Sequence, residues 1–245
     1  DIGAINSKLA RFFPAGFYYK TFIHPRFAWK HVFEPIIRRA AGLGSAPTNK
    51  DFNSYEHFYV HVDMLIVGGG VAGITAARAA INSGLKVLII EQNDYWGGRA
   101  SIDNVNIDGE LSANWVEKQI HKRSKADNFE LKLNTMAAGV YDHGYVLLHE
   151  NLIDEASQEA LLRQRLWRVR AKQIVTATGA IERPLSFANN DIPGVMLAAS
   201  VRDYAVNYGV SCGDKTVLVA NNDDAYRTAI TMKNAGLEVP CIIDA

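Results

Sequence analysis

Residues Met64 to Glu91 read MLIVGGGVAGITAARAAINSGLKVLIIE, and this stretch decides the fold. Met64 to Val67 is a short apolar run that ends in glycines, which is typical of a strand buried on both faces. A helix is expected from Val71 to Ser83, and Gly84 separates it from a second strand over Leu85 to Ile90. The order of strand, glycine turn, helix and strand predicts a βαβ unit of the dinucleotide-binding type.

Three glycines form the G-x-G-x-x-G pattern at the turn. Gly68 allows the tight turn, Gly70 lets the backbone approach a pyrophosphate, and Gly73 permits close packing of the helix on the strand. The phosphates are expected on the amides that open the helix, at Val71 and Ala72.

An acidic residue, Glu91, ends the second strand. An acid about 20 residues beyond the glycines is where a ribose hydroxyl is bound, and its charge disfavours a 2′-phosphate. The sequence therefore predicts NAD or FAD as the ligand rather than NADP.

Two further segments are candidates for the same site. The loop QNDYWGGR follows Glu91, and its glycine pair allows a close backbone approach that Tyr95 and Trp96 would cover; an ordinary turn is the alternative. The run QIVTAT, Gln173 to Thr178, is predicted as a buried strand, and Gly179 ends it. These segments add five candidate cofactor-binding residues: Gln92, Gly98, Arg99, Thr178 and Gly179.

Between these segments, the pattern predicts one helix and an antiparallel meander. The helix covers Ser112 to Ala126, with Trp115, Val116, Gln119 and Ile120 facing inward. The predicted strands are Phe129 to Met136, Gly139 to His149 and Leu161 to Arg170, and a separate parallel strand over Gln173 to Thr178 closes the sheet. The predicted fold class is α/β: a Rossmann-like parallel sheet of the two-dinucleotide-binding (FAD/NAD(P)) type with an antiparallel meander.

The C-terminal part repeats the opening motif without its glycines. A helix is expected over Ala198 to Tyr208, and the following strand, helix and strand match the first unit. Ala220, Asn222 and Ala225 stand in place of the three glycines. This is the start of a second Rossmann-like half, which we expect to be kept for its fold rather than for nucleotide binding.

The first 60 residues differ from the rest in the pattern of their aromatic, basic and polar residues. They contain the aromatic and basic segment Arg11 to Lys20, a predicted helix over Arg26 to Ala41 and a polar linker over Gly44 to Tyr55. Packing on a neighbouring domain or subunit explains these aromatics better than binding of single-stranded nucleic acid does. The expected division is an arm and linker (1–60), a dinucleotide-binding domain (61–180) and a connection with a degenerate second unit (181–245).

Composition narrows the function further. Lys plus Arg and Asp plus Glu number 26 each, which favours neither nucleic acid nor a membrane surface as a partner. We expect a cytoplasmic protein, two cysteines buried as small apolar residues, no metal site, and a chain that is part of a longer polypeptide. No general base or nucleophile stands out, so no catalytic residue is assigned.

Four stretches carry a specific resemblance: PAGFYYKTF, EPIIRRAAGLG, IVGGGVAG and ATGAIERPLSFANNDIPGVMLAASVRDY. Together they resemble the alpha subunits of heterotetrameric sarcosine oxidases, over essentially the whole chain. The resemblance implies a complex with beta, gamma and delta subunits that demethylates sarcosine to glycine, releases peroxide and passes the one-carbon unit to tetrahydrofolate. It also implies that FAD and FMN lie elsewhere in the complex and that this chain holds NAD at Gly68, Gly70, Gly73 and Glu91.

Two other functions remain open at this point. One is a self-contained NAD(P)H-dependent flavoprotein with FAD in the first site and a nicotinamide cofactor in the second Rossmann-like half. The missing glycines of that second half argue against it. The other is an assembly scaffold with a vestigial nucleotide fold, against which the intact first motif argues.

Overall fold

The computed structural model describes residues 22, 24–44, 48–124, 126–152 and 162–244. The chain forms two compact units that divide between Phe52 and Asn53. The described part of the first unit is one helical segment, which confirms the helix predicted there; the aromatic segment Arg11 to Lys20 lies outside the described residues. This helical segment comprises α3 (Arg26–Ala28), the π-helical turn η2 (Trp29–Phe33) and α4 (Glu34–Ala40).

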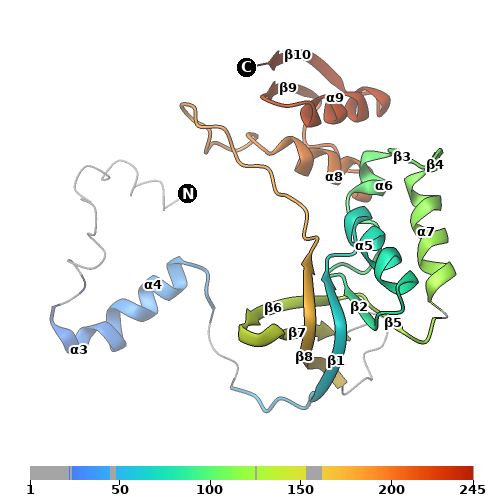
Figure 1. Ribbon diagram of the computed structural model, residues 1–245. Helices are drawn as coiled ribbons and strands as arrows, with labels where there is room; N and C mark the ends of the chain where they lie inside the picture. Colours follow the sequence, from blue (N-terminus) through green and yellow to red (C-terminus); the bar gives the residue numbers. More distant parts are fainter. Residues whose placement is uncertain (1–21, 23, 45–47, 125, 153–161, 245) are drawn as a thin grey trace. The chain divides into compact units, whose positions relative to one another are not determined.

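The second unit is built on a six-stranded sheet in the order β5-β2-β1-β8-β7-β6 (Figure 1). The first four strands in this order run parallel, and β7 and β6 are antiparallel to their neighbours. This arrangement confirms the predicted parallel sheet with an attached meander. The strands are β1 (Ser54–Val67), β2 (Val87–Ile90), β5 (Phe129–Lys132), β6 (Thr135–Tyr141), β7 (Tyr145–Asn151) and β8 (Leu162–Thr176).

Two helices cover one face of the parallel strands (Figure 1). α5 (Val71–Asn82) packs through its small residues, and α7 (Ser112–Arg123) packs beside it through Trp115 and Val116, as the sequence predicts. Between β2 and α7 the chain forms the short helix α6 (Ala100–Asp103) and a small hairpin of β3 (Asn106–Ile107) and β4 (Glu110–Leu111). Because the buried face of α5 consists of Gly73, Ala77 and Ala80 beside the single larger residue Ile74, its axis can approach the sheet closely.

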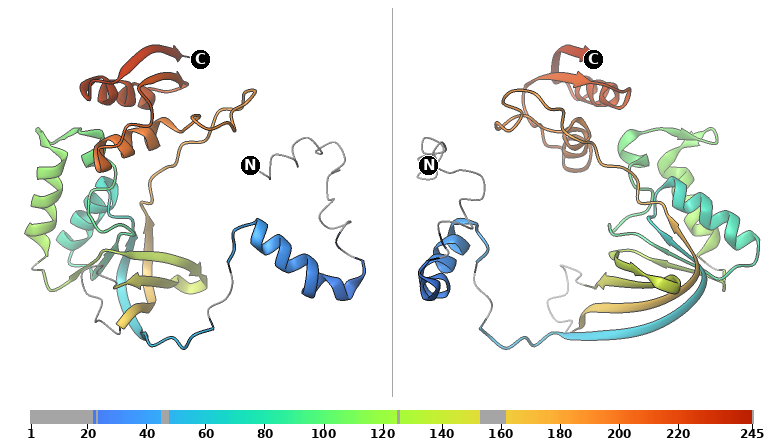
Figure 2. Two further views of the ribbon diagram at one scale, coloured as in Figure 1. Left: turned by 180° about the vertical axis from the view of Figure 1, so that it is seen from behind. Right: turned by 60° about the vertical axis from the view of Figure 1, so that its left-hand side comes forward.

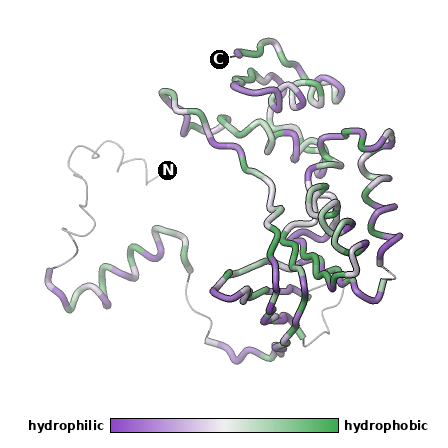
Figure 3. The backbone as a smooth tube through the Cα atoms, viewed as in Figure 1, coloured by the Kyte–Doolittle hydropathy of each residue, from purple (hydrophilic) through white to green (hydrophobic). Residues whose placement is uncertain are grey.

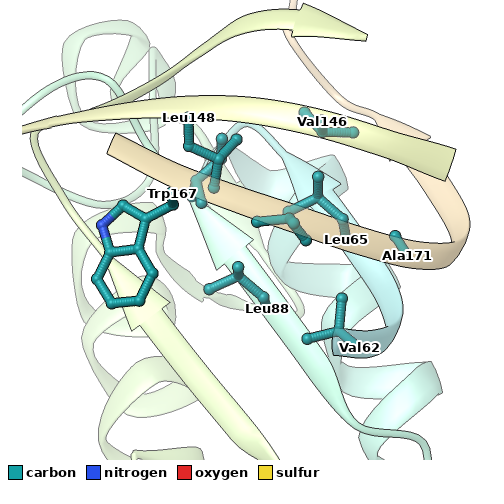
Figure 4. Close-up of a cluster of buried hydrophobic side chains, with 9 residues drawn as sticks. Val62, Leu65, Leu88, Val146, Leu148, Trp167 and Ala171 are labelled. Atoms are coloured by element: carbon teal, nitrogen blue, oxygen red, sulfur yellow. The ribbon is translucent and has the colours of Figure 1, made fainter. Parts of the chain in front are cut away.

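The meander packs over the opposite face of the central strands (Figure 4). Leu65 and Leu88 from the parallel strands meet Val146, Leu148 and Trp167 from β7 and β8, and all five are buried. Each such side chain contributes about 1.5–3 kcal/mol when it is fully buried. Figure 3 shows that strongly hydrophobic residues are concentrated where β1 and β2 run side by side.

An irregularity at Asp63 lets β1 contribute side chains both to the buried cluster beside the meander and to the buried cluster under α5 and α7. The amides of Asp63 and Met64 both donate to the carbonyl oxygen of Lys86, at 2.9 and 3.1 Å. This geometry places two residues of β1 opposite one residue, as in a β-bulge, and shifts the alternation of side chains. Val62 and Leu65 therefore face the meander, whereas Ile66 packs under α5.

Two predicted strand boundaries were wrong. The predicted strand Phe129–Met136 is divided at Asn134, whose φ of 49° turns the chain, so that β5 joins β2 and β6 joins the meander. The turn that the sequence Asp142-His143-Gly144 suggests within the segment Gly139–His149 is confirmed as the 3-10 turn η3 (Asp142–Gly144), which separates two paired antiparallel strands. The two strands predicted over residues 161–178 are one 15-residue strand, β8, which pairs with β1 along its length (Figure 2).

The boundary predicted at residue 60 falls within β1, and the division into domains stays a prediction. The second βαβ unit is present as predicted: β9 (Lys215–Ala220), α9 (Asp224–Asn234) and β10 (Glu238–Asp244), with β9 and β10 parallel. It is preceded by α8 (Ala198–Tyr208), whose bounds match the prediction. Burial of the two cysteines was a wrong prediction, because Cys212 and Cys241 are both exposed.

Candidate functional site

The glycine turn after β1 combines tight packing with one open position. A Cβ on Gly68, whose φ is 110°, would lie 2.3 Å from the carbonyl oxygen of Ala177, and one on Gly73 would lie 1.9 Å from that of Gly68. Both distances are impossible, so these two positions require glycine to pack β1, β8 and α5 together. A Cβ on Gly70 would meet nothing within 4 Å. Gly70 is the N-cap of α5 and leaves open space in front of the helix amides, as a phosphate requires.

Glu91 is held beneath this turn by the backbone. Its side chain is only 6% exposed, and its carboxylate accepts hydrogen bonds from the amides of Gly69 at 2.8 Å and Asn93 at 2.9 Å. Glu91 also lines the large cleft beside the turn. Two charge-assisted hydrogen bonds fix its position and leave its remaining lone pairs as acceptors for a ribose hydroxyl.

The loop after Glu91 is joined to the glycine turn. The Gly97 amide donates to the carbonyl oxygen of Gly69 at 2.8 Å, and a Cβ on Gly69 would lie 2.5 Å from the ring of Trp96. Trp96 therefore covers the backbone of the turn rather than open space. Gly98, whose φ is 55°, has the Cα of Gly70 3.3 Å from the position of a Cβ, so the glycine pair is needed for close approach of two backbone segments.

A cleft of about 1340 Å³ lies over the glycine turn. It exceeds the roughly 300–1,000 Å³ of pockets for drug-sized ligands, so it has room for an extended dinucleotide. All the predicted cofactor-binding residues except Gly73 border it: Gly68, Gly70, Val71, Ala72, Glu91, Gln92, Gly98, Arg99, Thr178 and Gly179. Gly73 has the packing role described above.

The opposite wall of the cleft is formed by α8. The sequence predicted this helix but did not indicate that it lines the site. Asp203, Tyr204 and Asn207 are among its cleft-lining residues. Asp203 accepts two hydrogen bonds from one nitrogen of Arg99, at 3.0 and 3.1 Å. The prediction of a helix here carried no signal for this contact, because Arg99 and Asp203 are 104 residues apart in the chain.

Tyr95 lines the cleft between these two walls. Burial, reinforced by the negative charges of Asp203, Glu91 and Asp94, raises the pKa of Tyr95 above its usual value of 10.0. The phenol therefore keeps its proton at neutral pH and can serve as a hydrogen-bond donor to a ligand.

The second βαβ unit differs at the corresponding position. Asn222 stands where the first unit has Gly70, and its side-chain oxygen accepts a hydrogen bond from the Asp224 amide at 2.9 Å. Asp244, at the end of β10, accepts a hydrogen bond from the Tyr226 hydroxyl at 3.0 Å. The first amide of α9 is thus already bonded to a side chain of the protein, whereas the N-terminus of α5 opens on the cleft.

The described part of the chain includes no group of three or more His, Cys, Asp or Glu side chains placed to hold a metal ion. None of its helices is both long and apolar enough to cross a membrane.

Comparisons with known proteins agree with this geometry. The sarcosine oxidase alpha subunit of Rhizobium meliloti (strain 1021) is 38% identical over 247 residues, which cover 100% of this chain and 25% of that protein. The subunit of the same name from Corynebacterium sp. (strain P-1) is 38% identical over 208 residues, covering 83% of this chain and 21% of that protein. The chain thus spans about a quarter of the length of these relatives, and the resemblance seen in the sequence is confirmed.

The solved structure of L-proline dehydrogenase from P. horikoshii is similar with a TM-score of 0.58 and 28% identity, covering 78% of this chain and 36% of that one. The family model described as FAD dependent oxidoreductase matches residues 63–186, about half of the chain, from the end of β1 to just beyond Gly179. This chain belongs to the FAD-dependent oxidoreductase family.

Proposed function

We propose that the cleft binds NAD, with its adenosine ribose on Glu91 and its pyrophosphate on the N-terminus of α5. The observation that carries the proposal is the pairing of a buried, backbone-held carboxylate with an open helix N-terminus at Gly70. The carboxylate accepts from ribose hydroxyls, and the free amides of the first helical turn attract the phosphate charge. These residues fit the ADP half of a dinucleotide; when bound, the nicotinamide would supply hydride-transfer chemistry.

The negative charge of Glu91 decides against NADP. A 2′-phosphate would lie against a carboxylate that is 6% exposed, where repulsion is poorly screened. Unmodified ribose lacks this penalty, so the site selects a dinucleotide without a 2′-phosphate.

FAD is the second candidate, because the family match over residues 63–186 favours a flavin. FAD has the same ADP half as NAD and would use the same contacts at Glu91 and α5. NAD is preferred on the sequence resemblance to sarcosine oxidase alpha subunits, which implies NAD in this chain and the flavins elsewhere in the complex. The self-contained flavoprotein is disfavoured, since the second βαβ unit lacks the glycines and the first amide of its helix α9 is already bonded to Asn222.

We further propose that the chain is the cofactor-binding part of a cytoplasmic sarcosine oxidase with beta, gamma and delta subunits. Such an enzyme oxidatively demethylates sarcosine to glycine and transfers the one-carbon unit to tetrahydrofolate. The 38% identity to two sarcosine oxidase alpha subunits, over 100% and 83% of this chain, supports this assignment. Beside the cleft, Glu91 is hydrogen-bonded to the protein's own backbone and Arg99 is paired with Asp203, which suits cofactor binding; amine oxidation is assigned to other parts of the assembly.

The test is to purify the full-length protein in its complex, denature it, and identify the released nucleotides by mass spectrometry. We expect one NAD for each copy of this chain. Gly70→Asp should lose that NAD, while Gly213→Asp should retain it, because Gly213 lies outside the cleft and a Cβ there meets only a carbonyl oxygen at 3.9 Å. FAD lost on Gly70→Asp in place of NAD would refute the NAD assignment, and a scaffold would release no adenine nucleotide from this site.

A further inference from the structure

Arg202 on α8 is a fully buried cation beside the cleft. Its side chain is 0% exposed, and one of its terminal nitrogens lies 2.9 Å from an oxygen of Asp103 and 2.9 Å from an oxygen of Asp224. Its other terminal nitrogen donates to the carbonyl oxygen of Asp224 and to the Thr228 hydroxyl, both at 3.0 Å. Four of its contacts therefore come from residues outside its own helix.

These contacts join three helices. Asp103 is the last residue of α6, which lies between β2 and α7. Asp224 is the first residue of α9, the helix of the second βαβ unit. A guanidinium buried from water is tolerated only while its carboxylate partners stay in place. Arg202 thus fixes α8 against both α6 and α9.

The position of α8 determines the width of the cleft, because this helix forms the wall opposite the glycine turn. Asp203, the next residue, points into the cleft and holds Arg99. Arg202 does not border the cleft, but its partner Asp103 does, and Asp103 also accepts a hydrogen bond from Arg99 at 3.3 Å. One network of ion pairs therefore runs from the buried core of α8 to both walls of the site.

We propose that Arg202 is a positioning residue for the nucleotide: it sets the distance between α8 and the glycine turn without touching the ligand. This inference rests on the proposed function, namely that the cleft binds NAD. A short ligand such as AMP needs only the wall made by Glu91 and α5. NAD also fills the space in front of α8, so its affinity depends on where α8 is held.

This difference gives a readout that separates positioning from folding. In the full-length protein freed of bound nucleotide, Arg202→Met should weaken NAD binding roughly tenfold, a usual size for coupling between distant positions. AMP binding should change by less than about twofold in the same variant, because its contacts stay intact. Isothermal titration of both ligands measures the two affinities.

Asp224→Asn is the second variant, because it removes one charge from the network while keeping the side-chain shape, and Asp224 does not line the cleft. It should lower NAD affinity in the same direction, and it decides the question if Arg202→Met does not fold. Arg165→Met is the matched control: Arg165 on β8 pairs with Glu56 on β1 at 2.8 Å, neither residue borders the cleft, and its loss should leave both affinities unchanged.

Equal weakening of NAD and AMP by Arg202→Met and Asp224→Asn would show a role in folding alone and overturn the proposal. Unchanged affinities for both ligands would overturn it as well. Failure of the unmutated protein to bind NAD is a different result, which refutes the proposed function itself. A selective loss of NAD affinity supports the proposal.

Discussion

Substitution of Gly70 by aspartate should keep the fold and remove the nucleotide. Gly70 has φ −72° and ψ −177°, which any residue adopts, and a Cβ there meets nothing within 4 Å. Aspartate is also a preferred N-cap residue, worth about 0.5–2 kcal/mol relative to alanine, so α5 should be no less stable. Thermal unfolding of both proteins freed of nucleotide should show a melting temperature of the variant equal to or above that of the unmutated protein, because bound NAD would itself stabilise the latter.

The binding penalty follows from the charge that aspartate places where the pyrophosphate should lie. Two like charges about 4 Å apart interact with about 4 kcal/mol at an effective dielectric constant near 20. Since every 1.4 kcal/mol changes affinity about tenfold, the NAD dissociation constant should rise by roughly three orders of magnitude. Titration calorimetry on the full-length protein measures this change.

Gly70→Asn separates charge from size. Asparagine caps helices about as well as aspartate and occupies nearly the same volume, but it carries no charge. We expect an intermediate loss of NAD affinity in this variant, due to steric overlap alone. Unchanged NAD affinity in Gly70→Asp would refute the placement of the pyrophosphate on α5, whatever the behaviour of the asparagine variant.

Three other substitutions test separate parts of the account. Glu91→Ala should weaken NAD binding by about 1–3 kcal/mol, the cost of unpaired buried polar groups, and titration that showed tighter binding would exclude Glu91 as the ribose ligand. Gly73→Ala should destabilise the fold by about 1–3 kcal/mol or more, because its Cβ would lie 1.9 Å from the Gly68 oxygen; a urea midpoint equal to that of the unmutated protein would contradict this packing. Hydrogen bonds from Lys172 and the Lys86 amide lower the pKa of Asp63 below its usual 3.8, so the carboxylate stabilises the fold above that pH and loses this effect as the pH falls through its lowered pKa. Acid unfolding of Asp63→Asn should therefore differ from that of the unmutated protein at neutral pH and converge with it at low pH; a constant difference would contradict the assignment.

Local patterns predicted the parts of the fold that depend on neighbouring residues. The three glycines, the helix they open and the buried acid at the end of β2 lie within 24 residues of one another, from Gly68 to Glu91, and the structure arranges them as the mechanism of dinucleotide binding requires. α8 was also predicted within its observed bounds; Gly209, which follows its last residue, is an ordinary signal for the end of a helix and adopts the left-handed conformation.

Features that depend on residues distant in the sequence were not predicted. The bulge at Asp63 arises from pairing with the segment at Lys86, and no local pattern marks it. The division at Asn134 was missed because apolar residues continue on both sides of it, while the turn depends on a single left-handed residue. The ion pairs of Arg202 could not be predicted from the sequence, because its two carboxylate partners lie on the separate helices α6 and α9.

The site shows the same division between local and distant information. The candidate cofactor-binding residues between Gly68 and Arg99 were identified from the sequence, and all of them except Gly73 border the cleft. Its opposite wall on α8 required the folded chain, because Asp203 approaches Arg99 only after the connection from Gly179 to Leu197 crosses to the second unit.

The central claim is that Glu91 binds the adenosine ribose of NAD in this cleft. The most direct measurement is the crystal structure of the full-length protein with NAD bound. We predict a ribose hydroxyl within hydrogen-bonding distance of the Glu91 carboxylate, about 2.5–3.0 Å between oxygens, with the pyrophosphate over Gly70 and Val71. NAD bound elsewhere in the protein, or lying in the cleft with its ribose away from Glu91, would contradict the account.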